Sequence, residues 1–259
     1  MGHNESANAV GPDHLIARLK AILDARMRVL ALVEAFGEGD PESWVQTLAA
    51  VVARAQQQDD GDAKLALEVI THAVAEPTLA YATRQGFYMA AIELGMPAIA
   101  RLFITTSPVI ELPATLKKQL GPERPLRPAG RPLSLGERKS AARTNNREQI
   151  GLLLRDPHPM VVAILLDNPH VTEADIVKMA AMRPAVPDAL AKIAAHPRWS
   201  PRHAVKRALV LNPSTPLADA IRITTTLRAA ELAELAQDPS LPEALREHAA
   251  DVRAASLRR

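Results

Sequence analysis

The chain has 259 residues and no cysteine, and 47% of its residues are apolar but only 3% are aromatic. The length allows one or two domains with a sizeable core, and the lack of cysteine excludes disulfides, thiolate metal sites and cysteine nucleophiles. The net charge of +2 conceals an asymmetry, because residues 1–116 carry a net charge of −6 and residues 117–148 one of +6. Few aromatic and many aliphatic residues favour closely packed helices over a β-sandwich.

The N-terminal part predicts a helical domain over residues 13–106, preceded by a polar, disordered arm over residues 1–12. Trp44 is expected to pack in its core. The arm lacks the basic and apolar segments of a signal peptide, so no signal peptide is expected. No apolar run is long enough to span a membrane, so no membrane-spanning helix is expected either. Apolar residues at helical spacing and polar breaks predict helices over residues 15–36, 45–55, 65–75, 79–94 and 97–104.

A proline-rich basic segment follows. Residues 107–133 hold six prolines and five lysines or arginines, which predicts a linker or an extended crossover. Ser134 and Glu137 then have the spacing of a capping box, so we expect a helix to begin there.

Regular proline steps mark the C-terminal part of the chain. A residue that precedes proline is disfavoured in the α conformation, so each step predicts the end of a helix. Steps two apart are separated by 26 to 29 residues, which predicts a unit of two short helices in about 28 residues. The steps are Asp156-Pro157, Asn168-Pro169, Arg183-Pro184, His196-Pro197, Asn212-Pro213 and Asp238-Pro239. The residues expected in the core are Val162, Leu165, Ile176, Met179, Leu190, Ile193, Val205, Leu209, Ile221, Leu232 and Leu235.

Two of these steps carry a resemblance to a known family. The stretches Asn212-Pro213-Ser214-Thr215-Pro216 and Asp238-Pro239-Ser240-Leu241-Pro242 resemble the steps of HEAT-like repeats and of the bacterial leucine-rich-repeat-variant type. The resemblance covers residues 134–253. It implies an all-α, HEAT-like α-solenoid of stacked short helix pairs over residues 134–259, and it implies a binding scaffold rather than an enzyme. The cysteine cluster that holds an iron–sulfur centre in the variant type is missing, and no cofactor is expected.

One stretch of the repeats is strongly basic. Between Ala189 and Ala218 there are five basic residues and no acidic one, and the 28-residue register places Lys178 beside Lys206 on the next unit. Helical spacing predicts that these side chains form an outward-facing cationic ridge with one aromatic residue at its edge. The candidate partner-binding residues are Lys178, Arg198, Trp199, Arg202, His203, Lys206 and Arg207.

Three interpretations of this ridge remain open: a solvated face with Trp199 filling a gap between repeats, a surface for an acidic protein segment, and a surface for nucleic acid. The nucleic-acid interpretation points to the HEAT-like DNA glycosylases, which need an acidic group that Trp199 lacks near it in sequence. No motif supports a hydrolytic or metal enzyme. His158, His170 and His196 each flank a proline and are expected to form local hydrogen bonds. The chain is therefore predicted to be a cytoplasmic, non-enzymatic protein-interaction scaffold, with nucleic-acid binding as the alternative.

Overall fold

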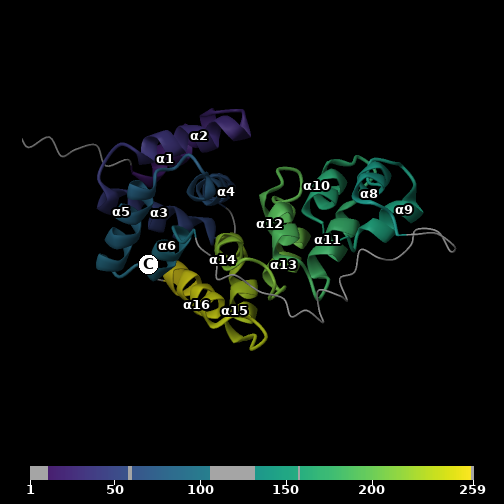
Figure 1. Ribbon diagram of the computed structural model, residues 1–259. Helices are drawn as coiled ribbons and strands as arrows, with labels where there is room; N and C mark the ends of the chain where they lie inside the picture. Colours follow the sequence, from purple (N-terminus) through teal and green to yellow (C-terminus); the bar gives the residue numbers. More distant parts are fainter. Residues whose placement is uncertain (1–10, 58–59, 106–131, 157, 258–259) are drawn as a thin grey trace, which may run out of the picture. The chain divides into compact units, whose positions relative to one another are not determined.

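The computed structural model describes four stretches of the chain, residues 11–57, 60–105, 132–156 and 158–257. These residues form fifteen α-helices and contain no strand, which confirms the predicted all-α class (Figure 1). Within the same residues, no helix has both the length and the apolar character that crossing a membrane requires. Most of the predicted arm (1–12) and of the predicted linker (107–133) lies outside the described residues.

The described residues form two compact units. The first unit combines residues 11–105 with residues 221–257, and the second unit comprises residues 132–220. This division differs from the predicted one, in which residues 134–259 form a single repeat domain. The physical reason lies in the last helix, which packs against two helices of the N-terminal part and is joined to them by Arg101, whose guanidinium pairs with Asp251.

The first unit is built around one long, buried helix. That helix, α3, contacts α1, α4, α5, α6 and α16. Its side chains Val45, Leu48 and Val51 are fully buried, so they form the centre of the core. The helices of this unit are α1 (Pro12–Ala21), α2 (Ala25–Phe36), α3 (Pro41–Ala55), α4 (Gly61–Ala75), α5 (Tyr81–Glu93), α6 (Pro97–Leu102), α15 (Ala229–Gln237) and α16 (Glu243–Leu257). A further helix, α14 (Leu217–Thr225), is divided between the two units.

A row of aromatic rings fills the core of the first unit. Trp44 packs edge-on against Phe36 with ring centroids 5.1 Å apart, and Phe36 packs in the same way against Phe87 at 5.3 Å. Phe103 extends the row at 5.1 Å from Phe87. The prediction that Trp44 lies in the core is confirmed, because only 4% of it is exposed.

The helix predicted over residues 15–36 is in fact two helices, α1 and α2. The break falls at residues 22–24, where Asp24 adopts an extended conformation and its carboxylate accepts a hydrogen bond from the Met27 N–H at 2.8 Å. Asp24 is therefore an N-cap, and this local competition of an acidic side chain with the helix overrides the apolar spacing.

The second unit consists of short helices that pack on their second neighbours. Helix α10 contacts α8 and α12, and α11 contacts α13, so alternate helices lie side by side (Figure 1). All eleven residues predicted for the core of the C-terminal part are buried. The helices of this unit are α8 (Leu135–Ala141), α9 (Arg147–Leu153), α10 (Pro159–Asp167), α11 (Glu173–Ala181), α12 (Pro187–Ala195) and α13 (His203–Val210). The predicted capping box of Ser134 and Glu137 is present at the start of α8.

Most proline steps lie just after helix ends, as predicted. Helices α10 and α12 end two residues before Pro169 and Pro197, whereas α11 and α13 end three residues before their prolines. The turn between α14 and α15 has no proline and was not predicted. At five steps the side chain before the proline accepts a hydrogen bond from the N–H two residues later, and these acceptors are Asp156, Asn168, His196, Asn212 and Asp238. Such turns satisfy backbone groups that the helix end leaves open.

Candidate binding surface

Helix α13 supplies most of the predicted cationic ridge. Its apolar side is fixed by Val205, Leu209 and Val210, which are fully buried against the neighbouring helices α11 and α12. Arg202 is the N-cap residue, with an extended backbone, and the helix proper begins at His203. The buried apolar side leaves Arg202, His203 and Arg207 exposed, and Lys178 is exposed on the adjacent helix α11.

Lys206 does not belong to the exposed surface. Only 6% of it is accessible, so the prediction that it lies on the outside of α13 is wrong. The prediction extrapolated the face of the helix from Arg202 by one turn, but Arg202 is an N-cap and does not have helical geometry. On the helix itself, Lys206 shares its side with Leu209 and Val210, which lie three and four residues later and are buried.

Trp199 is also buried, with 2% of its surface exposed. Its indole N–H donates a hydrogen bond to the carbonyl oxygen of Leu166 at 2.8 Å, so the ring joins the turn before α13 to the end of α10. It therefore fills a gap between helices, which was one of the interpretations left open, and it is not a stacking surface at the edge of the ridge.

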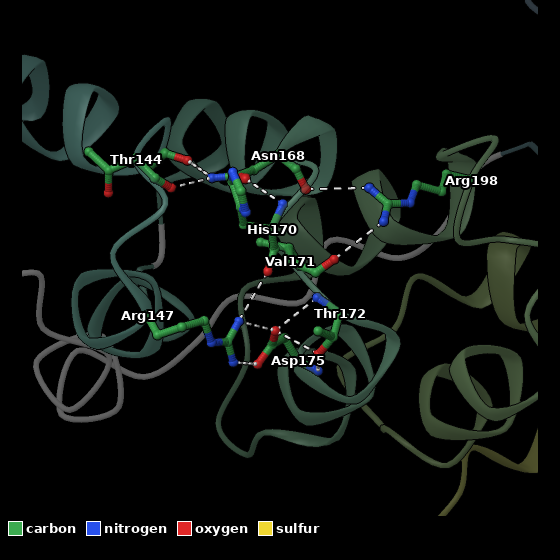
Figure 2. A network of polar contacts seen from close by, with 9 residues as sticks. Thr144, Arg147, Asn168, His170, Val171, Thr172, Asp175 and Arg198 are labelled. Carbon is green, nitrogen blue, oxygen red and sulfur yellow. Dashed lines mark hydrogen bonds and ion pairs between the residues drawn. The ribbon is translucent and has the colours of Figure 1, made fainter.

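Arg198 is exposed, but its guanidinium serves the same junction. It lies 4.2 Å from the centre of the Trp199 ring. It also donates hydrogen bonds to the carbonyl oxygens of Asn168 at 3.3 Å and Val171 at 3.4 Å (Figure 2). Arg198 thus braces the turn after α10, so its guanidinium is engaged within the fold, as are Trp199 and the buried Lys206.

Asn168 ties the same turn to the turn between α8 and α9. Its amide nitrogen donates to the carbonyl oxygens of Ala142 at 2.8 Å and Thr144 at 2.9 Å (Figure 2). Asn212 repeats this arrangement three proline steps later, where its amide donates to the carbonyl oxygens of Ala180 and Met182. Asparagine before proline therefore has a second role besides the turn, since it clamps the end of an earlier helix.

Acidic residues of the second unit bind part of the basic segment. Arg147 holds Asp175 through two hydrogen bonds of 2.8 and 2.9 Å, and this contact, with hydrogen bonds from Thr172, keeps the pKa of Asp175 far below its usual range (Figure 2). Arg138 binds both oxygens of Asp156, which is almost fully buried. Two of the charges in the +6 segment are therefore engaged in ion pairs within the fold.

The exposed remainder of the ridge is four side chains on two contacting helices, Lys178, Arg202, His203 and Arg207. Arg202 has a partner in Glu173, but the closest nitrogen–oxygen distance is 3.8 Å and both side chains are substantially exposed. An ion pair of this kind contributes little to stability and exchanges readily with another anion.

The histidines bear on two predictions, metal binding and local hydrogen bonds. No group of three histidine and acidic side chains in these stretches has the geometry to hold a metal ion. His158 and His196 accept hydrogen bonds from backbone N–H groups two residues later, as their positions beside proline predicted. For the His170 side chain the prediction stays open.

A cavity in the second unit was not predicted from the sequence. It has a volume of about 40 Å³ and lies among the end of α9, α10, α11 and the start of α12. Its lining residues are nearly all apolar and come from residues 154–156, Val162 and residues 179–193, so no single local pattern could indicate it.

The chain was compared with known protein families, curated proteins and solved structures. No protein-family model, no curated protein and no solved structure matches this chain. Fold and candidate site are therefore known from the residues and their geometry alone.

Proposed function

We propose that the chain is a non-enzymatic, HEAT-like α-solenoid scaffold that binds a protein partner through an acidic segment. The supporting observation is the exposed cationic group of Lys178, Arg202, His203 and Arg207 on two contacting helices above an aliphatic core. Stacked helix pairs present such extended surfaces without a polar pocket. A cysteine-free chain is compatible with the reducing cytoplasm, where we expect it to act.

Periodic contacts support the solenoid part of this proposal. Arg147 reaches Asp175, and Arg183 reaches the carbonyl oxygen of Leu211, so each of these side chains contacts a residue 28 positions later. The 28-residue spacing of the proline steps has the same length. Contacts that repeat with the period of the sequence are typical of arrays in which each unit packs on the next.

The test uses a charge-reversed ridge. Lys178→Glu, Arg202→Glu and Arg207→Glu are combined in one variant, which we expect to fold normally because exposed charges contribute under ~1 kcal/mol each. The matched control combines Arg18→Glu, Lys20→Glu and Lys64→Glu, which are exposed residues of the first unit. The measurement is the set of proteins from the source cells that immobilised chain retains. Loss of an acidic partner with the ridge variant but not with the control supports the proposal, and equal retention by both variants contradicts it.

Nucleic acid is the second candidate, and the same ridge supports it through its positive charge. We would expect single-stranded or duplex DNA and RNA to bind with an affinity that falls steeply between about 50 and about 200 mM salt and depends little on sequence. The buried position of Trp199 counts against a single-strand platform, because stacking needs an exposed ring. Salt-sensitive binding that the ridge variant abolishes would favour this alternative over a protein partner.

A further inference from the structure

The cavity of the second unit opens at its apolar rim. Its floor is formed by Val162, Leu190 and Ile193, which are essentially fully buried. Its rim includes Met182, Pro184, Val186 and Ala189, which are only half-buried. We call this feature the notch. Because side chains of its rim reach the surface, a group from outside can enter it.

The size of the notch limits what it can hold. A water molecule needs about 10–15 Å³ of such space, so about 40 Å³ accommodates roughly three or four non-hydrogen atoms. That is the end of one leucine, valine or methionine side chain. Sites for cofactors and drug-sized ligands are about 300–1,000 Å³, so the notch suits one anchoring side chain and not a small-molecule substrate.

The charge beside the notch is positive. Of its two charged lining residues, Asp156 is buried and is bound by Arg138. Arg155 is exposed, and among the described residues it has neither a hydrogen-bond nor an ion-pair partner. An unpaired guanidinium next to an apolar recess suits a segment that carries an aliphatic residue and a carboxylate close together, because arginine binds carboxylates through paired, charge-assisted hydrogen bonds.

We propose that the notch binds one aliphatic side chain of a protein partner, while Arg155 binds a carboxylate that lies next to that side chain in the partner. This inference rests on the proposed function, since it names a second contact by which a scaffold would hold an acidic segment. In protein interfaces a few side chains in well-packed, desolvated pockets supply most of the binding energy, and arginine is frequent among them.

Short random peptides displayed on phage and selected on the wild-type chain test this proposal. We expect the enriched peptides to share a leucine, valine, isoleucine or methionine within two positions of an aspartate or glutamate. Their affinity is then measured by fluorescence anisotropy of labelled peptide. Ala189→Phe should fill the notch, Arg155→Glu should repel the carboxylate, and each should weaken binding at least about tenfold, which corresponds to about 1.4 kcal/mol.

The matched control substitutions are both on α12, the helix that carries Ala189. Ala195→Phe and Lys192→Glu place the same groups at exposed positions of α12 that do not line the notch, and both should bind within about twofold of wild type. Circular dichroism and thermal unfolding check each fold. Should Ala189→Phe unfold the chain, Val186→Phe at the rim replaces it, and Arg155→Glu changes only an exposed side chain.

The outcomes separate the notch from the ridge. Selection without enrichment, or peptides that bind Ala189→Phe and Arg155→Glu like wild type, would overturn the notch proposal. Peptides lost only with the charge-reversed ridge would also overturn it while leaving the proposed function in place. Failure of the proposed function has a different signature, because the charge-reversed ridge variant and its control would then retain the same proteins from the source cells.

Discussion

In the first unit four aromatic rings pack in a row, whereas the second unit has Trp199 as its single aromatic residue and closes its core with aliphatic side chains. The second unit compensates at its turns, where Asn168 and Asn212 donate to carbonyl oxygens at the ends of earlier helices. The comparison teaches that short helices of small residues can be aligned by directional hydrogen bonds at their ends, whereas longer helices rely on the volume of their core.

The ion pairs differ in the same way. In the first unit Arg101, whose side chain is 19% exposed, joins α6 to Glu247 and Asp251 on the last helix, almost 150 residues later in the chain. In the second unit Arg147 and Arg138 bind acids 28 and 18 residues away. These ion pairs of the second unit close shorter loops than those of Arg101, and shorter sequence separation favours faster folding.

Each unit holds one tryptophan, so the units can be followed separately. Trp199→Phe leaves Trp44 to report on the first unit, and Trp44→Phe leaves Trp199 to report on the second. Each unfolding measurement uses the background whose remaining tryptophan lies in the unit under test.

Removal of the central ring should have the largest effect. Phe87 is 1% exposed and contacts both Phe36 and Phe103, so Phe87→Ala should lower the free energy of unfolding of the first unit by about 3–5 kcal/mol. The measurement is urea unfolding followed by Trp44 fluorescence. Tyr88→Ala, at a neighbouring position that is 38% exposed, is the control and should change much less. If both variants lower the free energy of unfolding by similar amounts, the row of aromatic rings is not the main stabilising part of the core.

The aliphatic core of the second unit should respond nearly as strongly. Leu209 is fully buried in α13, so Leu209→Ala should lower the free energy of unfolding of the second unit by about 2–5 kcal/mol. The measurement is urea unfolding followed by Trp199 fluorescence. Leu152→Ala at a 42% exposed site serves as the control. If Leu209→Ala changes the free energy of unfolding by no more than the experimental error, the core repacks to fill the space left by the leucine side chain.

The clamp at the proline step should contribute less than a core side chain. Asn212→Ala leaves the carbonyl oxygens of Ala180 and Met182 without their donor, which should cost about 1–3 kcal/mol. Asp238→Ala removes the equivalent turn from the first unit, where the bonds to Ser240 are exposed, and its cost should be smaller. Equal costs would indicate that the turn alone matters and the clamp to the earlier helix does not.

Acid should destabilise the first unit through His248. Complete burial, with a smaller contribution from Arg101, lowers the pKa of His248 to about 3, whereas an unfolded histidine has a pKa of about 6.5. The unfolded state therefore binds more protons between these values. The stabilisation is present in full above pH of about 6.5 and is lost as the pH falls, with a slope of up to about 1.4 kcal/mol per pH unit.

His248→Gln removes this titration and should flatten the pH dependence of the unfolding free energy between about pH 4 and pH 7. His14→Gln, at an exposed site of the same unit, should leave the slope unchanged. The measurement is urea unfolding of the Trp199→Phe background at several pH values. An unchanged slope in His248→Gln would show that His248 does not stay neutral and buried.

The smallest effect is expected at the exposed ridge. Arg202→Ala removes a loose contact of 3.8 Å to Glu173 and should change stability by less than ~1 kcal/mol. Arg101→Ala, at the more buried pair of the first unit, should cost more than Arg202→Ala in the same buffer. A reversed order would show that burial does not set the relative strength of these two ion pairs.

The sequence indicated much of the helical fold because its signals are local. Proline steps, the capping box at Ser134 and the spacing of apolar residues all act within one or two turns of the chain. They located the helices of the second unit to within a few residues, and every residue predicted for its core is buried. The same kind of signal failed at residues 22–24, where the cap formed by Asp24 competed with a continuous apolar pattern.

The candidate surface was less predictable, since exposure depends on what packs against each side of a helix. Charge spacing alone placed Lys206 and Trp199 on the ridge, but contacts with neighbouring helices bury both of them. No pattern in the sequence marked Arg155 or the notch, because their environment is assembled from several helices and turns between Leu154 and Ile193 that must pack together first.

The sequence alone was sufficient for the all-α class and for the helix ends at proline, since these depend on backbone sterics and local hydrogen bonds. Only the tertiary structure decided that residues 221–257 join the N-terminal helices, which charges stay exposed and where the notch lies. The physical reason is that burial of apolar surface is not directional, so a sequence specifies which side of a helix is covered but not by which partner.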